Sequence, residues 1–466
     1  MASRGIGARF LALGGGEVLA RLAAFGATVY LARTLSPAVY GIVGVAMGVM
    51  LYLTQVADGG IELVGVPLIA RARDRVADIA EPVLSVRFVA AVGLAALTIL
   101  LGLTVLPQPD GAVLASSSLA LLCSALSVRW VHLGLERAGG VAVSRTVGEL
   151  VALAVIVALV HDAGDVGLVP LAQFVGAAVT TGILLLTLRG VDRRLAWRWK
   201  PRAAAPVFQR SRHLVGFTLL GLLLFNFDLI YLRLRTGAEA AGYYAAAYTL
   251  IAFAANLIVA FAHTVLPNLT RLEGDPDARG RLFTTVCAQA FALALPVGVG
   301  AWYVSGQVVV QVFGEAYRPG VVALQWLAWS IPLAALRELP VVALIAAGEE
   351  RSLLRVNAWT AGCNVALVVA AVPQFGLVGA AAATLATEVI RLGLASHFAR
   401  KAGYPVVPPR RLMKASVASA VMGGALVIAA PGVLWTSVPL GVAVYAAALA
   451  LVGGVSFRAR FPGLSV

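Results

Sequence analysis

Residues 82–106 read PVLSVRFVAAVGLAALTILLGLTVL, an apolar run interrupted by a single charge, Arg87. An α-helix needs about 20 such residues to cross the hydrocarbon core of a bilayer. Similar runs recur along the whole 466-residue chain, in which 60% of residues are hydrophobic and mean hydropathy is +0.91. Charged residues make up only 12%, against about 25% in soluble proteins. The composition therefore predicts an all-α polytopic membrane protein.

Fourteen membrane spans are expected once turn signals rich in proline and glycine, such as residues 107–111 and 162–164, are used as boundaries. The second span has an alternative end near Ile69. The expected spans are 10–33, 40–57, 82–106, 113–134, 142–161, 167–188, 213–235, 243–267, 282–304, 320–346, 353–373, 377–399, 412–431 and 434–457.

The distribution of basic residues predicts the orientation of these spans. With the N-terminus in the cytoplasm, 27 of the 36 Lys and Arg residues lie in cytoplasmic segments, four lie outside and five lie within spans. Lys and Arg are enriched in cytoplasmic loops of membrane proteins. Both termini are therefore expected in the cytoplasm, and the first span, although preceded by a basic segment, is expected to be retained because Glu17 and Arg21 interrupt a signal-like core.

The net charge of +14 has the same explanation. Basic residues between apolar spans indicate contact with anionic membrane lipids, and no nucleic-acid partner is expected. Cys123, Cys287 and Cys363 are isolated from one another in apolar stretches. Neither a disulfide framework, nor a metal site, nor a cofactor is expected.

Weak internal similarity predicts two pseudo-symmetric lobes of six helices with two further C-terminal helices. Tyr30, Leu31 and Gly41 align without a gap with residues 231, 232 and 242, and Gly-Leu-Val occurs at both 167–169 and 376–378. Such duplication is typical of transporters in which two lobes rock around a central site. The expected division is an N-lobe at 1–188, a basic connector at 189–212, a C-lobe at 213–400, and helices 13 and 14 with the C-terminus at 401–466.

Five short motifs resemble those of bacterial polysaccharide flippases. They read LARTLSPAVYG at 31–41, NFDLIYL at 226–232, GYYAAAY at 242–248, VFGEAY at 312–317 and GLVGAA at 376–381. In order and spacing they are similar to the oligosaccharide/polysaccharide flippase branch of the multidrug/oligosaccharidyl-lipid/polysaccharide exporter superfamily, which includes O-antigen and lipid II flippases.

This resemblance implies a transporter of the bacterial inner membrane, without catalytic residues. It would move undecaprenyl-pyrophosphate-linked oligosaccharide from the cytoplasmic to the periplasmic leaflet by alternating access, for surface polysaccharide such as lipopolysaccharide or exopolysaccharide. The implied partners are the polyprenyl-pyrophosphate-linked glycan, glycosyltransferases and a polysaccharide polymerase. Two alternatives remain: a cation-coupled multidrug exporter of the same superfamily, and a membrane-embedded glycan polymerase or ligase.

Charges within spans supply the candidate site residues, because they are costly in a bilayer and usually face a cavity or a partner. Arg21, near the expected midplane of its helix, is the first candidate to bind pyrophosphate, and Arg391 and Arg337 are weaker candidates. Four acids are candidates for charge pairing or cation coupling: Glu17, Asp228, Glu388 and Asp58. Arg87 and Arg129 are expected to extend towards lipid headgroups, and Arg337 and Glu338, as sequence neighbours, are not expected to face one another.

Overall fold

The computed structural model describes residues 3–188, 201–272, 274–430 and 432–453. Within these ranges, some side chains of α1, α3, α10 and α11 lie outside the description, including those of Glu17 and His263. All regular secondary structure in the described ranges is helical, which confirms the all-α prediction. The chain divides into two compact units, Met1–Asn226 and Phe227–Val466, and each is considered by itself.

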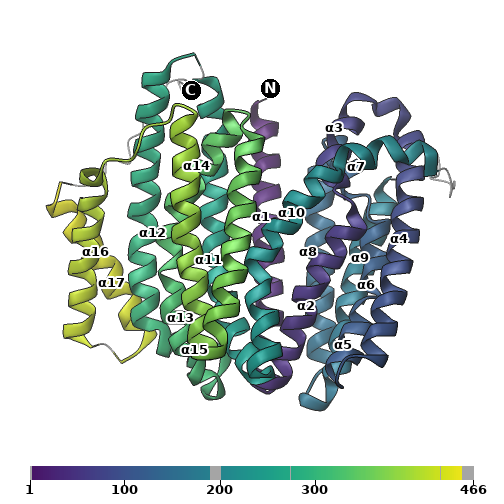
Figure 1. Cartoon of the computed structure of the whole chain (residues 1–466), viewed down its shortest axis with the longest axis horizontal. Coiled ribbons are helices and arrows are strands. Elements are labelled where there is room, and N and C mark those ends of the chain that lie inside the picture. The colour runs from purple at the N-terminus through teal and green to yellow at the C-terminus, as the bar shows by residue number, and fades with distance from the viewer. Residues whose placement is uncertain (1–2, 189–200, 273, 431, 454–466) are drawn as a thin grey trace. The chain divides into compact units, whose positions relative to one another are not determined.

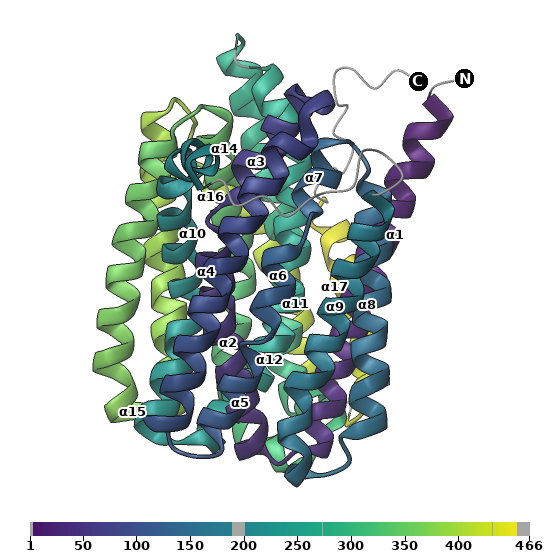
Figure 2. The ribbon, with the colours of Figure 1, turned by 90° about the vertical axis from the view of Figure 1, so that its right-hand side faces the viewer.

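The first unit contains, among its described residues, nine α-helices, two short 3-10 helices and the first part of α10. Figures 1 and 2 show α2, α4, α8 and α9 running along a common direction, with the short helices α3 and α7 near one end. The elements are α1 (Ser3–Thr34), α2 (Pro37–Asp58), α3 (Ile61–Arg71), η1 (Arg73–Arg75), α4 (Val76–Thr104), α5 (Asp110–Ser117), α6 (Ala120–Leu126), α7 (Arg129–Gly134), α8 (Ala138–Leu159), η2 (Ala163–Leu168), α9 (Val169–Leu188) and α10 (Pro201–Thr236).

Small residues allow the helices of this unit to approach closely, as is usual for helices packed in membranes. A Cβ added to Gly148 of α8 would lie 2.7 Å from the carbonyl oxygen of Gly176 in α9. Likewise, a Cβ on Gly102 of α4 would lie 2.6 Å from the carbonyl oxygen of Gly111 in α5. Backbones therefore touch at these positions, where a larger residue would separate the helices.

The second unit contains the last part of α10 and the remaining helices. These are α11 (Ala238–Arg271), α12 (Pro276–Phe313), η3 (Glu315–Gly320), α13 (Val321–Ala328), α14 (Ser330–Ala346), α15 (Glu350–Lys401), α16 (Pro409–Ala429) and α17 (Leu434–Leu451).

The two C-terminal helices are attached to α12 by polar contacts. The Arg411 guanidinium of α16 donates to the hydroxyls of Thr284 and Thr285 at 2.9 and 3.0 Å. The Tyr445 hydroxyl of α17 donates to the carbonyl oxygen of Ala292 at 2.5 Å. Helices α16 and α17 thus belong to the same compact unit as α12. The duplication and the lobe boundaries expected from the sequence stay predictions.

The helices correspond in order to the fourteen expected spans. Ten helical stretches among the described residues are long and apolar enough to cross a membrane. One of them, α15, has 52 residues and would be about 78 Å long at ~1.5 Å per residue, enough for two crossings. It breaks at Gly376, with φ 53° and ψ −126°, where the sequence places the boundary between two spans. Helices α1, α10 and α11, with 32, 36 and 34 residues, account for the other three.

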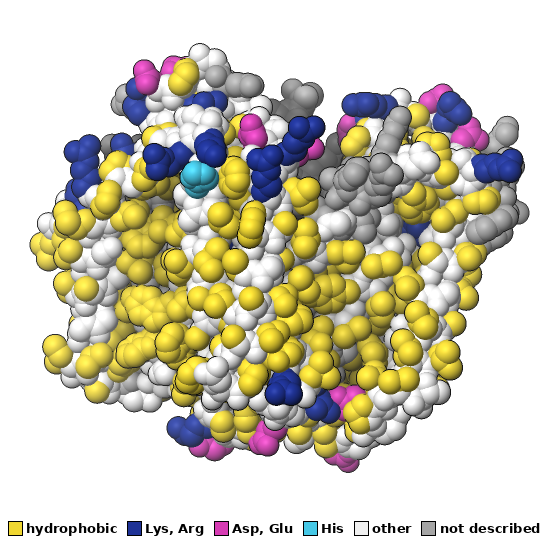
Figure 3. Space-filling view, in the orientation of Figure 1, with side chains coloured by type: hydrophobic (Ala, Val, Ile, Leu, Met, Phe, Trp, Pro, Cys, Tyr) yellow, Lys and Arg dark blue, Asp and Glu magenta, His cyan; other side chains and the backbone are white. Residues whose placement is uncertain are grey.

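The surface of each unit fits a bilayer environment. On the face drawn in Figure 3, hydrophobic side chains cover the middle of the helices, and charged side chains gather towards their ends. Large apolar side chains such as Leu100, Leu103, Val442 and Ile428 are exposed. In water such exposure would be unfavourable, whereas in lipid it satisfies the hydrophobic requirement of a spanning helix.

Candidate functional site

The first candidate from the sequence, Arg21, lies on α1 and is half-buried. The side chain of its expected partner Glu17 lies outside the described residues. Their pairing therefore stays a prediction.

A second group of candidates lies together in the core of the second unit. The Arg337 guanidinium of α14 donates to Glu388 of α15 at 2.8 Å and to its own neighbour Glu338 at 2.6 Å. Arg391 of α15 donates to the Asn357 side chain at 3.4 Å. All five residues are buried or nearly so. Two cations and two anions thus balance one another, as buried charges require.

The contact between Arg337 and Glu338 corrects the expectation that these sequence neighbours do not face one another. Their Cβ atoms point in different directions around the helix, but both side chains are long enough to bend back and meet. Arg337 therefore holds two carboxylates, one from its own helix and one from α15.

Asp228 links three helices of the second unit. Its carboxylate, on α10, accepts hydrogen bonds from the Tyr244 hydroxyl of α11 and from the Thr384 hydroxyl of α15, the latter at 2.9 Å. Its other oxygen accepts from the backbone N–H of Leu229 at 2.8 Å. The side chain is 1% exposed. This buried carboxylate therefore accepts three hydrogen bonds.

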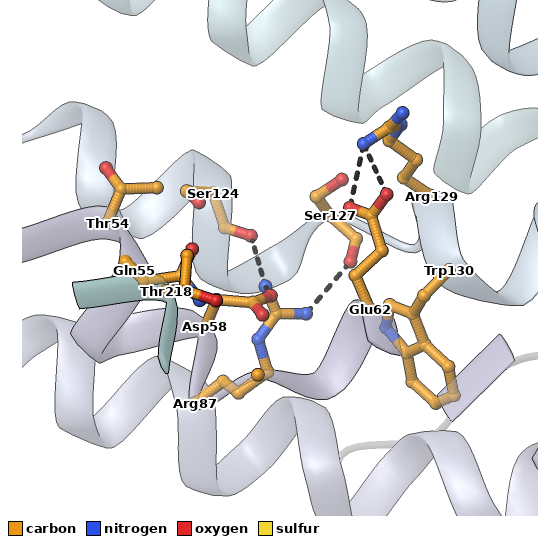
Figure 4. A pocket seen from close by; sticks show the side chains of 11 residues that line it. Thr54, Gln55, Asp58, Glu62, Arg87, Ser124, Ser127, Arg129, Trp130 and Thr218 are labelled. Carbon is orange, nitrogen blue, oxygen red and sulfur yellow. Dashed lines mark hydrogen bonds and ion pairs between the residues drawn. The ribbon is translucent and has the colours of Figure 1, made fainter. Parts of the chain in front are cut away.

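A polar pocket of about 450 Å³ lies in the first unit and is shown in Figure 4. Its inner part is an ion pair. Arg87 of α4 donates to Asp58, the last residue of α2, at 2.8 Å. Arg87 also donates to the carbonyl oxygens of Ser124 and Ser127 at 3.0 and 3.2 Å. These carbonyls lie at the C-terminal end of α6, where helix carbonyls lack partners within the helix and favour a cation.

The outer part of the pocket is a second ion pair. Arg129, at the start of α7, donates to both oxygens of Glu62 in α3, at 2.6 and 2.7 Å. These side chains are 44% and 42% exposed, whereas that of Arg87 is 3% exposed. The exposed pair is therefore better able to open than the inner one, because solvent compensates separated charges at an exposed position.

Two glycines bring the acidic residues of both pairs to the pocket. Helix α2 ends at Asp58, and Gly59 and Gly60 follow with φ of 61° and 70°. Only glycine adopts this left-handed conformation at little cost. The chain turns there and starts α3 at Ile61, so that Asp58 and Glu62 both line the same pocket. This break also settles the end of the second span at Asp58 rather than near Ile69.

An apolar cluster packs next to the pocket and supports it. Trp130 of α7 is 2% exposed and packs with Ile61, Ile69 and Val83. Its ring lies against Gly65, where an added Cβ would be 2.5 Å from the indole. The remaining lining is polar: Thr54, Gln55, Ser124, Ser127 and Thr218. The pocket can thus both donate and accept hydrogen bonds around a small polar ligand.

Sequence reasoning missed most of this site. The expectation that Arg87 extends to the headgroups is wrong, because Arg87 is buried in an ion pair with Asp58. Arg129 pairs with Glu62 and remains 44% exposed, so its extension towards the headgroups stays a prediction. The partners are 29 and 67 residues apart, so no helical periodicity connects them. One signal in the sequence could have indicated the two ion pairs. Two arginines and two acids are all expected near the cytoplasmic ends of neighbouring spans, so each cation has an acid available to it.

The arrangement of helices is that of membrane flippases and multidrug transporters. The chain superposes with a TM-score of 0.77 on a structure titled "Lipid II flippase MurJ, inward closed conformation", at 11% identity, covering 94% of this chain and 98% of that one. An inward-facing multidrug resistance MATE family transporter of the MOP superfamily matches with a TM-score of 0.62 at 13% identity, covering 82% and 95%. A mutant of the MATE transporter VcmN from Vibrio cholerae matches with 0.55 at 15% identity, covering 84% and 97%. The chain thus shares its fold with these transporters.

Within this class, the sequence identifies the family. The chain belongs to the polysaccharide biosynthesis protein family, whose model matches residues 6–273. No protein with curated function matches it in sequence.

Proposed function

We propose that this protein flips undecaprenyl-pyrophosphate-linked oligosaccharide from the cytoplasmic to the periplasmic leaflet of the bacterial inner membrane, by alternating access, for surface polysaccharide biosynthesis. The membership of the polysaccharide biosynthesis protein family supports a glycan-related substrate. The TM-score is also higher with the lipid II flippase than with the multidrug transporters, 0.77 against 0.62 and 0.55.

The observation that carries the proposal is the polar pocket of the first unit. A headgroup of sugars and phosphates cannot enter hydrocarbon without polar partners. The pocket offers two arginines, two carboxylates and several hydroxyls inside a unit whose outer surface is apolar. In the proposed topology, with both termini cytoplasmic, the pocket lies near the cytoplasmic ends of the spans, where the headgroup is loaded.

Arg21 is the proposed cation for the pyrophosphate. It is half-buried on α1, and a guanidinium grips phosphate oxygens with two parallel hydrogen bonds. Arg337 and Arg391 have less support in this role because they are buried, and Arg337 already holds two carboxylates. Glycosyltransferases and a polymerase are proposed partners that supply and consume the lipid-linked glycan.

A cation-coupled multidrug exporter is the second candidate function, because MATE transporters share the fold. A polymerase or ligase has no comparable support, since the fold is that of transporters. Deletion of the gene separates the two candidates. The flippase function requires lipid-linked intermediates to accumulate on the cytoplasmic leaflet and surface polysaccharide to fall. Unchanged polysaccharide together with greater sensitivity to cationic dyes would instead support the exporter.

A complementation test addresses Arg21 in particular. The variant Arg21→Gln should reach normal membrane levels and fail to restore surface polysaccharide, whereas Arg21→Lys should restore part of it, because an ammonium keeps the charge and loses the planar fork. Full restoration by Arg21→Gln at normal protein levels would contradict a role of this side chain in pyrophosphate binding.

A further inference from the structure

Two N–H groups in the polar pocket have no acceptor among the described residues. They are the indole Nε1 of Trp130 and the guanidinium Nε of Arg87, and these residues are only 2% and 3% exposed. Both residues line the pocket. Figure 4 shows the nitrogen of Trp130 on the side of the indole ring that is nearer Glu62 and Arg87.

Buried donors of this kind are uncommon in folded proteins. An N–H that is removed from water without an acceptor is destabilising, and such groups often point to a bound molecule. Because both residues line one cavity, a single ligand with acceptor oxygens could satisfy both N–H groups. The ligand must therefore present oxygens to the inner wall of the pocket.

The charges of the pocket indicate that this ligand is uncharged. Arg87 is paired with Asp58 and Arg129 with Glu62, so the two cations and two anions sum to zero. A phosphate would add one or two negative charges to a site whose cations are already neutralised, and an uncompensated buried charge is strongly unfavourable. A neutral ligand adds none.

The rest of the lining matches a molecule rich in hydroxyls. Thr54, Thr218 and Gln55 each offer a donor and an acceptor. Sugar hydroxyls also both donate and accept, and their oxygens can accept from the two N–H groups. A volume of about 450 Å³ lies within the ~300–1,000 Å³ of typical small-molecule sites.

We propose that this pocket is a subsite for uncharged sugar residues of the lipid-linked glycan. Trp130 Nε1 and Arg87 Nε donate to sugar oxygens, Gln55 orients a hydroxyl, and the pyrophosphate binds elsewhere. This inference rests on the proposed flippase function and adds to it the part of the substrate that the pocket recognises.

The test compares two lipids that differ only in the sugar. The full-length protein in nanodiscs is titrated with undecaprenyl-pyrophosphoryl-N-acetylglucosamine and with undecaprenyl pyrophosphate, and Kd is measured for each. The variant Trp130→Phe keeps an aromatic ring and removes the N–H. Because that N–H has no acceptor among the described residues, its removal breaks no described hydrogen bond. Loss of one bond to a ligand corresponds to a roughly 2- to 10-fold weaker Kd.

We expect Trp130→Phe to weaken binding of the sugar-bearing lipid by this factor and to leave Kd for undecaprenyl pyrophosphate unchanged. Gln55→Leu should likewise weaken binding of the sugar-bearing lipid alone. It serves as a second, independent variant if Trp130→Phe folds poorly. The matched control is Trp359→Phe, at a position 67% exposed on α15, which should change neither Kd.

Three outcomes would overturn the inference or its basis. Equal loss for both lipids would place the phosphate in the pocket. If the Trp130→Phe and Gln55→Leu proteins bound both lipids as the parent does, neither Trp130 nor Gln55 would contact a sugar, and the proposed subsite would be wrong. Failure of the parent protein to bind either lipid would reject the flippase function itself, which distinguishes that failure from failure of the sugar subsite.

Discussion

The inner ion pair of the polar pocket makes a quantitative prediction about stability. The variant Asp58→Asn keeps the size of the side chain and one acceptor oxygen but removes the negative charge. Arg87, 3% exposed, would then be a buried cation without its paired carboxylate. Removing one partner of a buried pair typically costs about 3–5 kcal/mol.

The structure places the expected loss at the lower end of that range. Arg87 keeps its hydrogen bonds to the carbonyl oxygens of Ser124 and Ser127, which partly stabilise its charge. We therefore expect Asp58→Asn to lower the free energy of unfolding by about 3 kcal/mol. The reverse change, Arg87→Met, should cost less, because Asp58 is 19% exposed and can be hydrated from the pocket.

The double variant distinguishes the cost of an unpaired buried charge from the cost of the altered side-chain shapes. When Arg87→Met is combined with Asp58→Asn, no charge remains buried, so the double variant should be more stable than the sum of the single losses by at least about 1.5 kcal/mol, within the range for contacting residues. Equilibrium unfolding in mixed micelles, with a rising fraction of dodecyl sulfate, measures all four proteins. Additive losses, or an Asp58→Asn protein within about 0.5 kcal/mol of the parent, would refute the argument.

Three further predictions concern packing, charge and topology. Gly148→Ala should lower the free energy of unfolding by about 1–3 kcal/mol, because the new Cβ would meet a threonine hydroxyl of α9 at 1.9 Å. The neutral control is Gly182→Ala on α9, where an added Cβ has no neighbour within 4 Å. Equal losses of stability in the two variants would contradict the close approach of α8 and α9. Arg337→Met should reduce folded protein in fluorescence-detected size-exclusion chromatography, since two buried carboxylates lose their cation; a normal yield would argue against a structural role. Alkaline phosphatase fused after Gly164 should be active and after Arg202 inactive, because basic residues favour the cytoplasm; an inactive fusion after Gly164 would contradict the count of spans.

Much of the fold could be predicted because the signals for membrane spans are local. Each span needs about 20 apolar residues, and the turns between spans carry their own proline and glycine residues. The break of α15 at Gly376 illustrates this. Its positive φ suits glycine, and the sequence places a span boundary at the same residue.

Pairing of charges could not be predicted, because it depends on which helices become neighbours. Glu388 lies three residues before Arg391, a spacing that favours contact along a helix, yet the structure directs Glu388 to Arg337 of α14. Arg87 has no acid within a helical turn of its own position and meets Asp58 from α2 instead. Long side chains extend across helix boundaries, so spacing along one helix does not decide their partners.

Hydrophobicity and turn residues act over short distances, so the class of protein, the order of its apolar helices and the family resemblance could be obtained from the amino-acid sequence. Only the folded chain shows that one pocket is lined by Arg87, Arg129, Asp58, Glu62 and Trp130. The reason is physical: a buried charge must find a counter-ion or hydrogen-bond partners, and the packing of helices from distant parts of the chain determines which residues lie within reach.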